Sequence, residues 1–275
     1  MPEMPEVRTM VKGLNPLVSN KVIESVDFIV PKMLKEITES EFNKEVIGKT
    51  IKVVENIGKW IVFKLSEETI ILSHLRMTGT YYFYNNKPNE ISKHAGIIFK
   101  FTDGTELHFN DSRKFGTMHL RYLSNYLEMK PLDKLAKEPQ DLEPEEFHKS
   151  LNKTSRAIKT VVLDQHHVIG FGNIYVDETL WEARIHPETP ASKITLKEAK
   201  DILKIGASIM DHATKLGGSS IRTYGSVNGK PGEFQKFLKV FDRAGQECLR
   251  CKTTLQKSRV NGRGTVTCAK CQIKK

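Results

Sequence analysis

All four cysteines of this chain lie in its last 28 residues, and their spacing limits what that segment can become. They are Cys248, Cys251, Cys268 and Cys271, two C-x2-C pairs separated by sixteen residues. Two such pairs separated by about 15 to 20 residues are typical of tetrathiolate zinc sites rather than of disulfides. The sequence therefore predicts a small finger, similar to a zinc ribbon, that holds one structural Zn²⁺.

The positive charge of the chain is concentrated on the same segment. The net charge is +10, and residues 248–275 hold eight basic residues and no acidic one. The other 247 residues hold 35 basic and all 33 acidic residues. Four thiolates on one Zn²⁺ contribute about −2, which leaves the finger near +6 and suited to a polyanion. We expect nucleic acid as the partner. The alternative is that the finger is a purely structural zinc site whose basic surface only aids solubility.

The other end of the chain combines a proline at position 2 with carboxylates at positions 3 and 6. From Pro5 to Leu17, apolar residues recur at three- and four-residue steps, the pattern of an amphipathic helix packed on a core. Removal of the initiator methionine would give Pro2 a secondary amine, a nucleophile that is partly uncharged near pH 7. The alternative is that Pro2 and Glu3 only begin a helix.

Strand patterns dominate the chain up to about residue 125, and helical patterns follow. Expected strand segments, rich in Val, Ile, Phe, Tyr and Thr, are 21–30, 50–65, 69–84 and 96–122. Turn sequences interrupt them at 56–58 and 103–104. After a charged, proline-containing stretch at 131–144, helical stripes occupy 154–165, 173–184 and 196–216.

These patterns predict an α+β fold in three parts. Residues 1–130 form an N-terminal antiparallel β-sandwich with flanking helices, residues 131–233 a helical domain, and residues 234–275 the cysteine finger. No apolar run approaches the roughly 18 residues of a membrane span, and the N-terminus lacks the apolar region of a signal peptide. We therefore expect a soluble, cytoplasmic monomer with no membrane partner.

Six motifs along the chain resemble those of the Fpg/Nei family of formamidopyrimidine-DNA glycosylases. They are Pro2-Glu3-Met4-Pro5-Glu6-Val7, Gly58-Lys59, His74-Leu75-Arg76-Met77-Thr78-Gly79, Asp111-Ser112-Arg113-Lys114-Phe115-Gly116, Asp164-Gln165 with Gly170-Phe171-Gly172-Asn173-Ile174-Tyr175, and Gly262-Arg263-Gly264-Thr265. They occur in the family's order. The resemblance implies a helix-two-turn-helix middle domain and a bifunctional glycosylase and AP lyase that removes oxidised purines (8-oxoguanine and formamidopyrimidines) from damaged double-stranded DNA.

The resemblance also implies catalytic roles. Pro2 would attack the deoxyribose C1′ of a flipped-out nucleotide, expel the base and form an iminium, after which β- and δ-elimination would cut the strand. Glu3 would serve in the acid and base steps. Lys59, after the turn at 56–58, would hold a phosphate beside the lesion, although a lone lysine after a turn is ordinarily a solvated surface group. Arg263, on the finger, would contact the lesion-strand backbone at the site.

A second group of residues is implied to contact DNA. Met77 and Phe115 would open the base stack, and Arg113 would hydrogen-bond the orphaned cytosine. The alternative is that Met77 and Phe115 are core residues of strands. At Lys114 the family usually has a second arginine. A phosphate contact there would therefore be made by a single point charge instead of a bidentate guanidinium. Asn173, at the start of a helix, suits a phosphate. His94 and Lys159 are further expected contacts, and the loop 219–224 matches the region that cradles an oxidised purine.

Two other functions remain possible at this stage. A Nei-type enzyme would remove oxidised pyrimidines instead, but the Pro-Glu-Met-Pro-Glu-Val and His-Leu-Arg-Met-Thr-Gly stretches are more similar to Fpg. A non-catalytic, zinc-containing protein that binds damaged DNA is the other alternative. The joint presence of Pro2, Glu3 and Lys59 argues against it.

Overall fold

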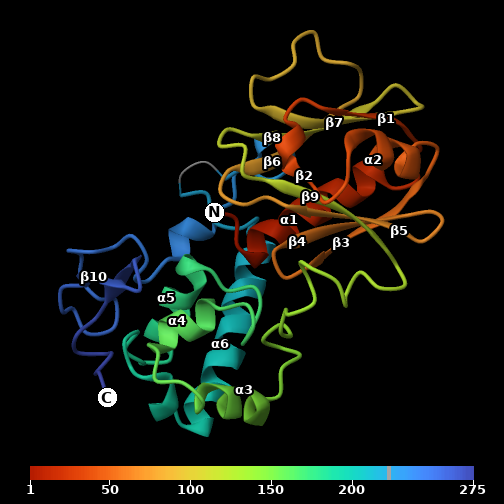
Figure 1. The fold of residues 1–275 in the computed structure, drawn as a ribbon. Helices are drawn as coiled ribbons and strands as arrows, with labels where there is room; N and C mark the ends of the chain where they lie inside the picture. Colours follow the sequence, from red (N-terminus) through yellow and green to blue (C-terminus); the bar gives the residue numbers. More distant parts are fainter. Residues whose placement is uncertain (222–223) are drawn as a thin grey trace. The chain divides into compact units, whose positions relative to one another are not determined.

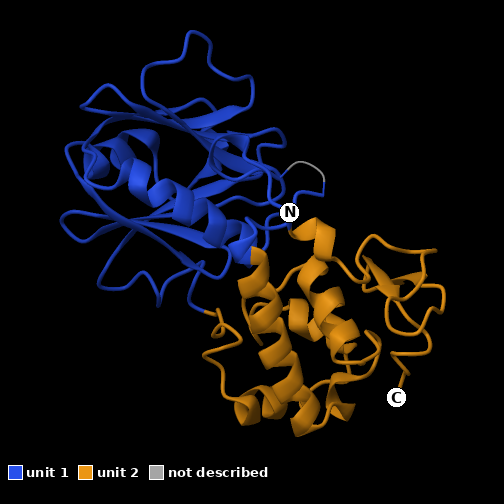
Figure 2. Ribbon diagram, turned by 180° about the vertical axis from the view of Figure 1, so that it is seen from behind, with its two compact units in different colours: residues 1–133, 214–233 blue, residues 134–213, 234–275 orange. Residues whose placement is uncertain are grey.

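A computed structural model describes residues 1–221 and 224–275 of the chain. This described part forms two compact units, residues 1–133 with 214–233 and residues 134–213 with 234–275 (Figure 2). The chain thus leaves the first unit near residue 133 and returns to it for twenty residues. The three-part division with boundaries at 130 and 233 stays a prediction.

The first unit contains most of the strands. Its elements are α1 (Met4–Val18), β1 (Ile23–Phe28), the 3-10 turn η1 (Pro31–Met33), β2 (Leu34–Lys35), α2 (Glu39–Val46), β3 (Ile51–Ile57), β4 (Trp60–Leu65), β5 (Thr69–His74), β6 (Gly79–Tyr84), β7 (Ala95–Phe101), β8 (Glu106–Asp111), β9 (Thr117–Tyr122) and η3 (Val227–Gly229) (Figure 1). The predicted turns at 56–58 and 103–104 connect β3 to β4 and β7 to β8.

Two sheets make the sandwich of this unit. One has the strand order β1-β7-β8-β6 and the other β2-β9-β5-β4-β3, and only the short β2–β9 pair is parallel. Their inner faces share one hydrophobic cluster, in which Phe63 packs edge-on against Tyr81 at 5.8 Å between ring centroids. The predicted antiparallel β-sandwich is confirmed, because alternate side chains of both sheets are buried against each other.

Helix α1 runs opposite to β3, and this fixes where its first turn lies. The Asn20 N–H donates to the Ile51 carbonyl, and the Asn15 Oδ1 accepts from the Val54 N–H at 2.8 Å. Earlier helix residues therefore lie beside later strand residues. The first turn of α1 therefore lies toward the end of the unit where the turn between β3 and β4 is found.

The second unit is mainly helical. Its elements are α3 (Pro144–Leu151), α4 (Ile158–Leu163), α5 (Asn173–Glu182), the 3-10 turn η2 (Ala191–Lys193), α6 (Leu196–Lys215, the last two residues of which belong to the first unit), the 3-10 turn η4 (Phe234–Phe237), β10 (Gln256–Val260) and β11 (Arg263–Thr267). Thr195 and Glu198 form the capping box that begins α6: the Glu198 N–H donates to the Thr195 hydroxyl at 3.2 Å, and the Thr195 N–H donates to the Glu198 carboxylate at 2.9 Å. None of the helices in residues 1–221 and 224–275 has the length and apolar character needed to cross a bilayer.

Strands β10 and β11 form a hairpin that carries the second cysteine pair at its end. The two-residue turn is Asn261-Gly262, with φ of +46° and +75°, the left-handed pair that an Asn-Gly hairpin turn favours. Cys248, Cys268 and Leu255 pack with Trp181 of α5 in one buried cluster. The predicted finger therefore packs on the helical part of the same unit.

Three local features differ from the sequence expectations. Helices α2 and α3 were not expected, although Thr38 and Glu41 form a capping box at the start of α2. The segment 225–232 is rich in glycine, a composition that predicts a mobile loop, but it is anchored to β6 instead. Asn228 Oδ1 accepts the Phe83 N–H at 2.8 Å, and the Thr80 hydroxyl donates to the Gly225 carbonyl at 3.2 Å.

Candidate active site and nucleic-acid contacts

The start of α1 is buried, and a carboxylate fixes it to a distant loop. Pro2 and Glu3 are both buried, and Glu6 accepts the Glu3 N–H at 2.8 Å with one oxygen and the Ser219 N–H at 2.8 Å with the other. Gly218 has a φ of +80°, and a Cβ there would lie 2.7 Å from Glu6 Oε1. Glu6 thus holds the segment 218–219 against the residues that precede α1.

The hydroxyl of Tyr224 makes a second tie between this loop and α1. It donates to the Glu6 carbonyl at 3.0 Å, and burial together with the Glu6 charge raises the pKa of Tyr224. The phenol therefore stays protonated and remains a donor. Of the loop 219–224 that resembles the family's purine-binding region, residues 222 and 223 lie outside the described residues.

Strand pairing brings three of the predicted site segments to one edge of the five-stranded sheet. Trp60 pairs with His74, and His74 pairs with Thr117. Lys59 precedes Trp60, so it lies at the edge where the 75–78 loop leaves β5 and the 112–116 loop enters β9. Lys59 is 8% exposed and is therefore not the solvated surface lysine of the alternative interpretation.

His74 is a neutral residue at this edge. Burial, and then the charges of Arg76 and Lys59, lower its pKa to about 3. Its Nδ1 accepts the Arg76 N–H at 2.9 Å, so the single proton of the neutral ring is on Nε2. The histidine thereby fixes the first turn of the loop that carries Met77.

The proposed wedge residues are exposed on the loops at this edge. Met77 is 37% exposed and Phe115 is 51% exposed, which excludes the alternative that they belong to a strand core. The Arg113 guanidinium lies 4.7 Å from the centre of the Phe115 ring, a cation–π contact. Lys114, between them, is exposed and has a φ of +56°. The structure thus brings Met77, Arg113 and Phe115 together with Lys59 at one end of the first unit.

His94 lies just before β7 in the same unit. Its side chain is half-buried, and its carbonyl accepts the Asp111 N–H at 2.8 Å. The backbone of His94 therefore belongs to the framework of the 112–116 loop. Its predicted DNA contact stays a prediction.

In the second unit, Asn173 and Arg263 meet at the finger hairpin. Asn173 is the first residue of α5, which is capped by Gly172 and not by Asn173 itself. The Asn173 side-chain amide donates to the Gly264 carbonyl at 2.9 Å, next to the exposed Arg263 at the start of β11. The positive end of the α5 helix dipole and the Arg263 guanidinium can both serve an anion here.

Lys159 requires a correction. Its side chain is fully buried, and its ammonium lies 2.6 Å from Asp177 and donates to the Gly264 carbonyl at 3.0 Å and the Thr265 hydroxyl at 2.8 Å. Burial outweighs the Lys159 charge and raises the pKa of Asp177 to about 7. A buried ammonium with three internal acceptors presents no surface to a phosphate, so the predicted direct DNA contact does not fit. Lys159 instead holds the hairpin residues beside Arg263.

The four cysteines fit one zinc ion. Their sulfurs all lie within 4.8 Å of one another, with Cys251 and Cys268 at 3.4 Å and Cys248 and Cys271 at 4.0 Å, and none forms a disulfide. Tetrahedral thiolates at about 2.3 Å from Zn²⁺ are about 3.8 Å apart, which matches these distances. The cysteines hold one structural zinc ion, as predicted.

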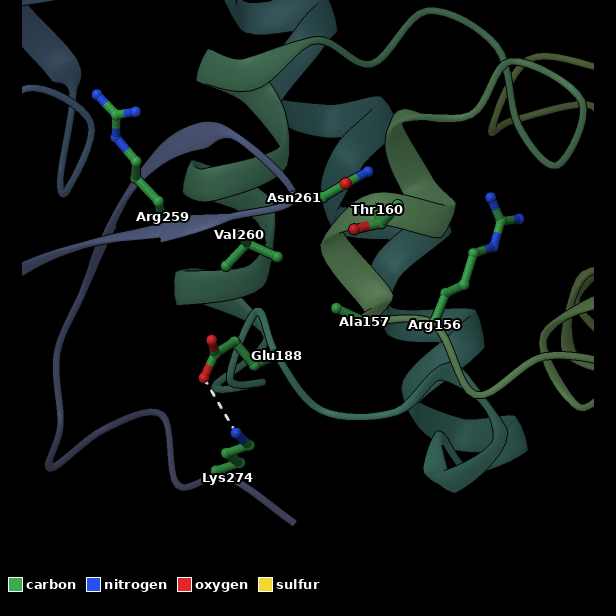
Figure 3. A pocket seen from close by; sticks show the side chains of 8 residues that line it. All are labelled: Arg156, Ala157, Thr160, Glu188, Arg259, Val260, Asn261 and Lys274. Atoms are coloured by element: carbon green, nitrogen blue, oxygen red, sulfur yellow. Dashed lines mark hydrogen bonds and ion pairs between the residues drawn. The ribbon is translucent and has the colours of Figure 1, made fainter.

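A cavity of about 450 Å³ lies between the start of α4 and the finger hairpin (Figure 3). Arg156 and Arg259 line it, but their guanidinium groups point away from each other in Figure 3. Lys274 at its lower end pairs with Glu188 at 3.1 Å. The cationic groups do not converge on one point, so we assign no small-molecule site to this cavity.

Sequence reasoning missed three buried carboxylates that hold these segments. Glu178 accepts the N–H groups of residues 239–241 at 2.8–2.9 Å, Asp177 pairs with Lys159, and Asp111 bonds the 112–116 loop. Asp111 belongs to a quoted motif, yet its role was not inferred. An acidic residue at the end of an apolar strand, directly before a loop, is the signal that could have drawn attention to it.

The β-sandwich unit and the helical unit with its tetracysteine hairpin define a zinc-finger protein of the DNA-binding class. Three family models match the chain: the formamidopyrimidine-DNA glycosylase N-terminal domain at residues 1–118, the formamidopyrimidine-DNA glycosylase H2TH domain at 135–225, and the zinc finger found in FPG and IleRS at 245–273. The chain belongs to the formamidopyrimidine-DNA glycosylase family.

Full-length relatives support this membership. The formamidopyrimidine-DNA glycosylase of Mycoplasmopsis pulmonis is 46% identical over 275 residues, which cover 100% of this chain and 99% of the relative. That of Mycoplasma mobile is 47% identical over 272 residues, 99% of each chain. Lactococcus lactis Fpg in complex with abasic-site DNA has a TM-score of 0.93 at 36% identity, with 99% of this chain and 100% of that chain covered. The wild-type Lactococcus lactis Fpg with DNA containing N7-benzyl-Fapy-dG has a TM-score of 0.92 at 35% identity, with the same coverage.

Proposed function

We propose that this protein is a base-excision repair enzyme that removes oxidised purines from duplex DNA and cleaves the strand at the resulting abasic site. One observation carries the proposal. Buried Pro2 and Glu3 precede a helix whose start points to the same end of the first unit as Lys59 and the exposed Met77, Arg113 and Phe115. The Lactococcus lactis structures, which hold DNA with N7-benzyl-Fapy-dG or an abasic site, support the substrate class.

The chemistry begins at the Pro2 nitrogen, freed by removal of Met1. This nitrogen attacks C1′, the bond from C1′ to the base breaks, and the proton released by Pro2 balances the one taken up by the leaving base. Opening of the C1′–O4′ bond then gives an iminium at Pro2 and a C4′ hydroxyl, with Glu3 supplying the proton to O4′. The iminium acidifies C2′–H, and two successive eliminations expel the 3′ and the 5′ phosphate.

The remaining residues bind and deform the DNA. Met77 and Phe115 fill the space of the extruded nucleotide, which offsets an unstacking cost of a few kcal/mol per step. Arg113 bonds the unpaired cytosine. Lys59, His94 and Lys114 contact the backbone from the first unit.

In the second unit, Asn173 and Arg263 bind backbone phosphates of the lesion strand. Lys159 positions the hairpin that carries Arg263 through the Gly264 carbonyl and the Thr265 hydroxyl. All of these groups come from a single chain, so the proposal includes a monomer. It acts in the cytoplasm, where the chromosome of bacteria such as the relatives lies.

Strand cleavage of lesion duplexes tests the proposed function. We expect single-turnover excision from 8-oxoguanine or formamidopyrimidine opposite cytosine to be at least on the order of tenfold faster than from thymine glycol opposite adenine, because the full-length relatives are formamidopyrimidine-DNA glycosylases. The measurement is product formation on denaturing gels with labelled duplexes. Faster processing of thymine glycol would favour the Nei-type alternative, and tight binding without any cleavage would favour the non-catalytic one.

The opposite-base preference depends on Arg113. Arg113→Ala should reduce the preference for cytosine opposite the lesion by roughly 1–3 kcal/mol, the value of one good base contact. Arg263→Ala is the control, because loss of a phosphate contact should weaken binding to all duplexes and reduce the slope of log K against log[salt] by about one. The measurement is excision from lesions paired with each of the four bases. An equal loss opposite every base would contradict the role of Arg113.

A further inference from the structure

The carboxylate of Asp111 bonds two loops at once. Asp111 is the last residue of β8 and is 1% exposed. Its Oδ2 accepts the N–H groups of Phe115 and Gly116, each at 2.7 Å, and its Oδ1 accepts the Arg113 N–H at 3.0 Å. The Thr78 hydroxyl, from the loop that carries Met77, also donates to Oδ1. One buried group therefore joins the Met77 loop to the 112–116 loop.

Each loop follows a path that needs this support. Arg76 has a φ of +53° and Lys114 a φ of +56°, left-handed conformations that cost a non-glycine residue on the order of 1 kcal/mol. Gly116 leaves no room for a side chain, because a Cβ there would lie 2.5 Å from the Phe109 ring. The Arg113 N–H also lies 3.3 Å from the Thr78 hydroxyl, so the loops touch directly.

Charge-assisted bonds to a buried carboxylate are stronger than neutral ones, and losing one leaves a buried charge poorly satisfied. All four donors come from the segments that carry Met77, Arg113 and Phe115. A displacement of one loop would break bonds that hold the other. The two loops should therefore have one common conformation rather than two independent ones.

We propose that Asp111 is a positioning residue that, with the Thr78 hydroxyl, couples the Met77 loop to the 112–116 loop, so that the stack is opened and the orphaned base is contacted in one step. The inference rests on the proposed function, because it needs a duplex to open. Asp111 is 1% exposed and both of its oxygens accept bonds from these loops, so the proposal gives it no contact with the reacting atoms. Its effect should be limited to steps that require the wedge.

A double-mutant cycle measures the coupling. Met77→Ala and Arg113→Ala are made singly and together, in the native protein and in Thr78→Val, which removes the hydroxyl with little change of shape. Single-turnover excision from 8-oxoguanine opposite cytosine is the readout. We expect non-additivity on the order of tenfold in the native background and at most about twofold in Thr78→Val. Thr78→Ser, which keeps the hydroxyl, should retain it.

Thr80→Val is the matched control. Thr80 is also half-buried and lies two residues after Thr78, at the start of β6. Its hydroxyl donates to the Gly225 carbonyl instead of to Asp111. In this variant the non-additivity should persist. Additive effects of Met77→Ala and Arg113→Ala in an active native protein would overturn the coupling, whereas a native protein that does not excise the lesion would overturn the proposed function instead.

Asp111→Asn provides a second measurement. An amide in place of one oxygen turns an acceptor into a donor that faces backbone N–H groups. Excision from duplex should fall by roughly 10- to 100-fold, while cleavage of a single-stranded oligonucleotide with an abasic site, which needs no wedge, should change by about twofold or less. Proportional losses on both substrates would assign Asp111 to fold stability alone and refute the inference. If this variant does not fold, the Thr78 cycle decides.

Discussion

Protein that retains Met1 will fold and bind lesion DNA but will not excise the damaged base. A proline nitrogen in a peptide bond has its lone pair in amide resonance and carries no proton to lose, so it cannot form the iminium. Because Met1 lies outside α1, its retention should leave the helix and its Glu6 contacts intact. Excision should fall by at least on the order of 10³-fold, the scale on which loss of a nucleophile acts.

The measurement is borohydride reduction in the presence of lesion duplex, followed by peptide mapping of the cross-linked protein. Protein produced with methionine aminopeptidase inhibited should give no cross-link, and protein from untreated cells should give one at Pro2. Pro2→Gly offers a primary, more flexible amine after methionine removal and should be slow but active. A cross-link on Lys59, together with full activity of the Met1-retaining protein, would show that Pro2 and Glu3 have no catalytic role and only begin a helix.

The features predicted well from the sequence are those encoded by residues close together in the chain. The C-x2-C pairs, the stripe that forms α1 and the turn at 103–104 each need only a short stretch to be recognised. The antiparallel sandwich followed from strands separated by turn sequences. In each case the local preference and the final structure agree.

The features missed depend on contacts between distant segments. Lys159 looked like a surface cation because nothing near it in sequence indicates Asp177 on the next helix or Thr265 on the finger. The return of residues 214–233 to the first unit depends on Glu6, more than two hundred positions earlier, which accepts the Ser219 N–H. Pairings of this kind satisfy buried polar groups, and no periodicity reports them.

The second large effect concerns zinc. Removing the metal with a chelator should unfold the β10–β11 hairpin while α4, α5 and α6 stay helical. Structural zinc sites in small fingers contribute an apparent 10–16 kcal/mol, and a two-stranded hairpin alone is only marginally stable. The buried cluster around Cys248 and Cys268 is too small to hold the finger once its thiolates are unpaired.

Loss of the hairpin would remove more than the finger, because Gly264 and Thr265 supply two of the three acceptors around Lys159. Arg263 would lose its fixed position at the same time. Affinity for lesion duplex should therefore fall by at least on the order of 10²-fold, and Cys268→Ser should behave in the same way. Native mass spectrometry and hydrogen exchange measure the metal content and the hairpin, and added Zn²⁺ should restore binding to the stripped native protein but not to the variant. Normal binding by stripped protein would show that Lys159 and Asp177 hold Arg263 in place without the metal.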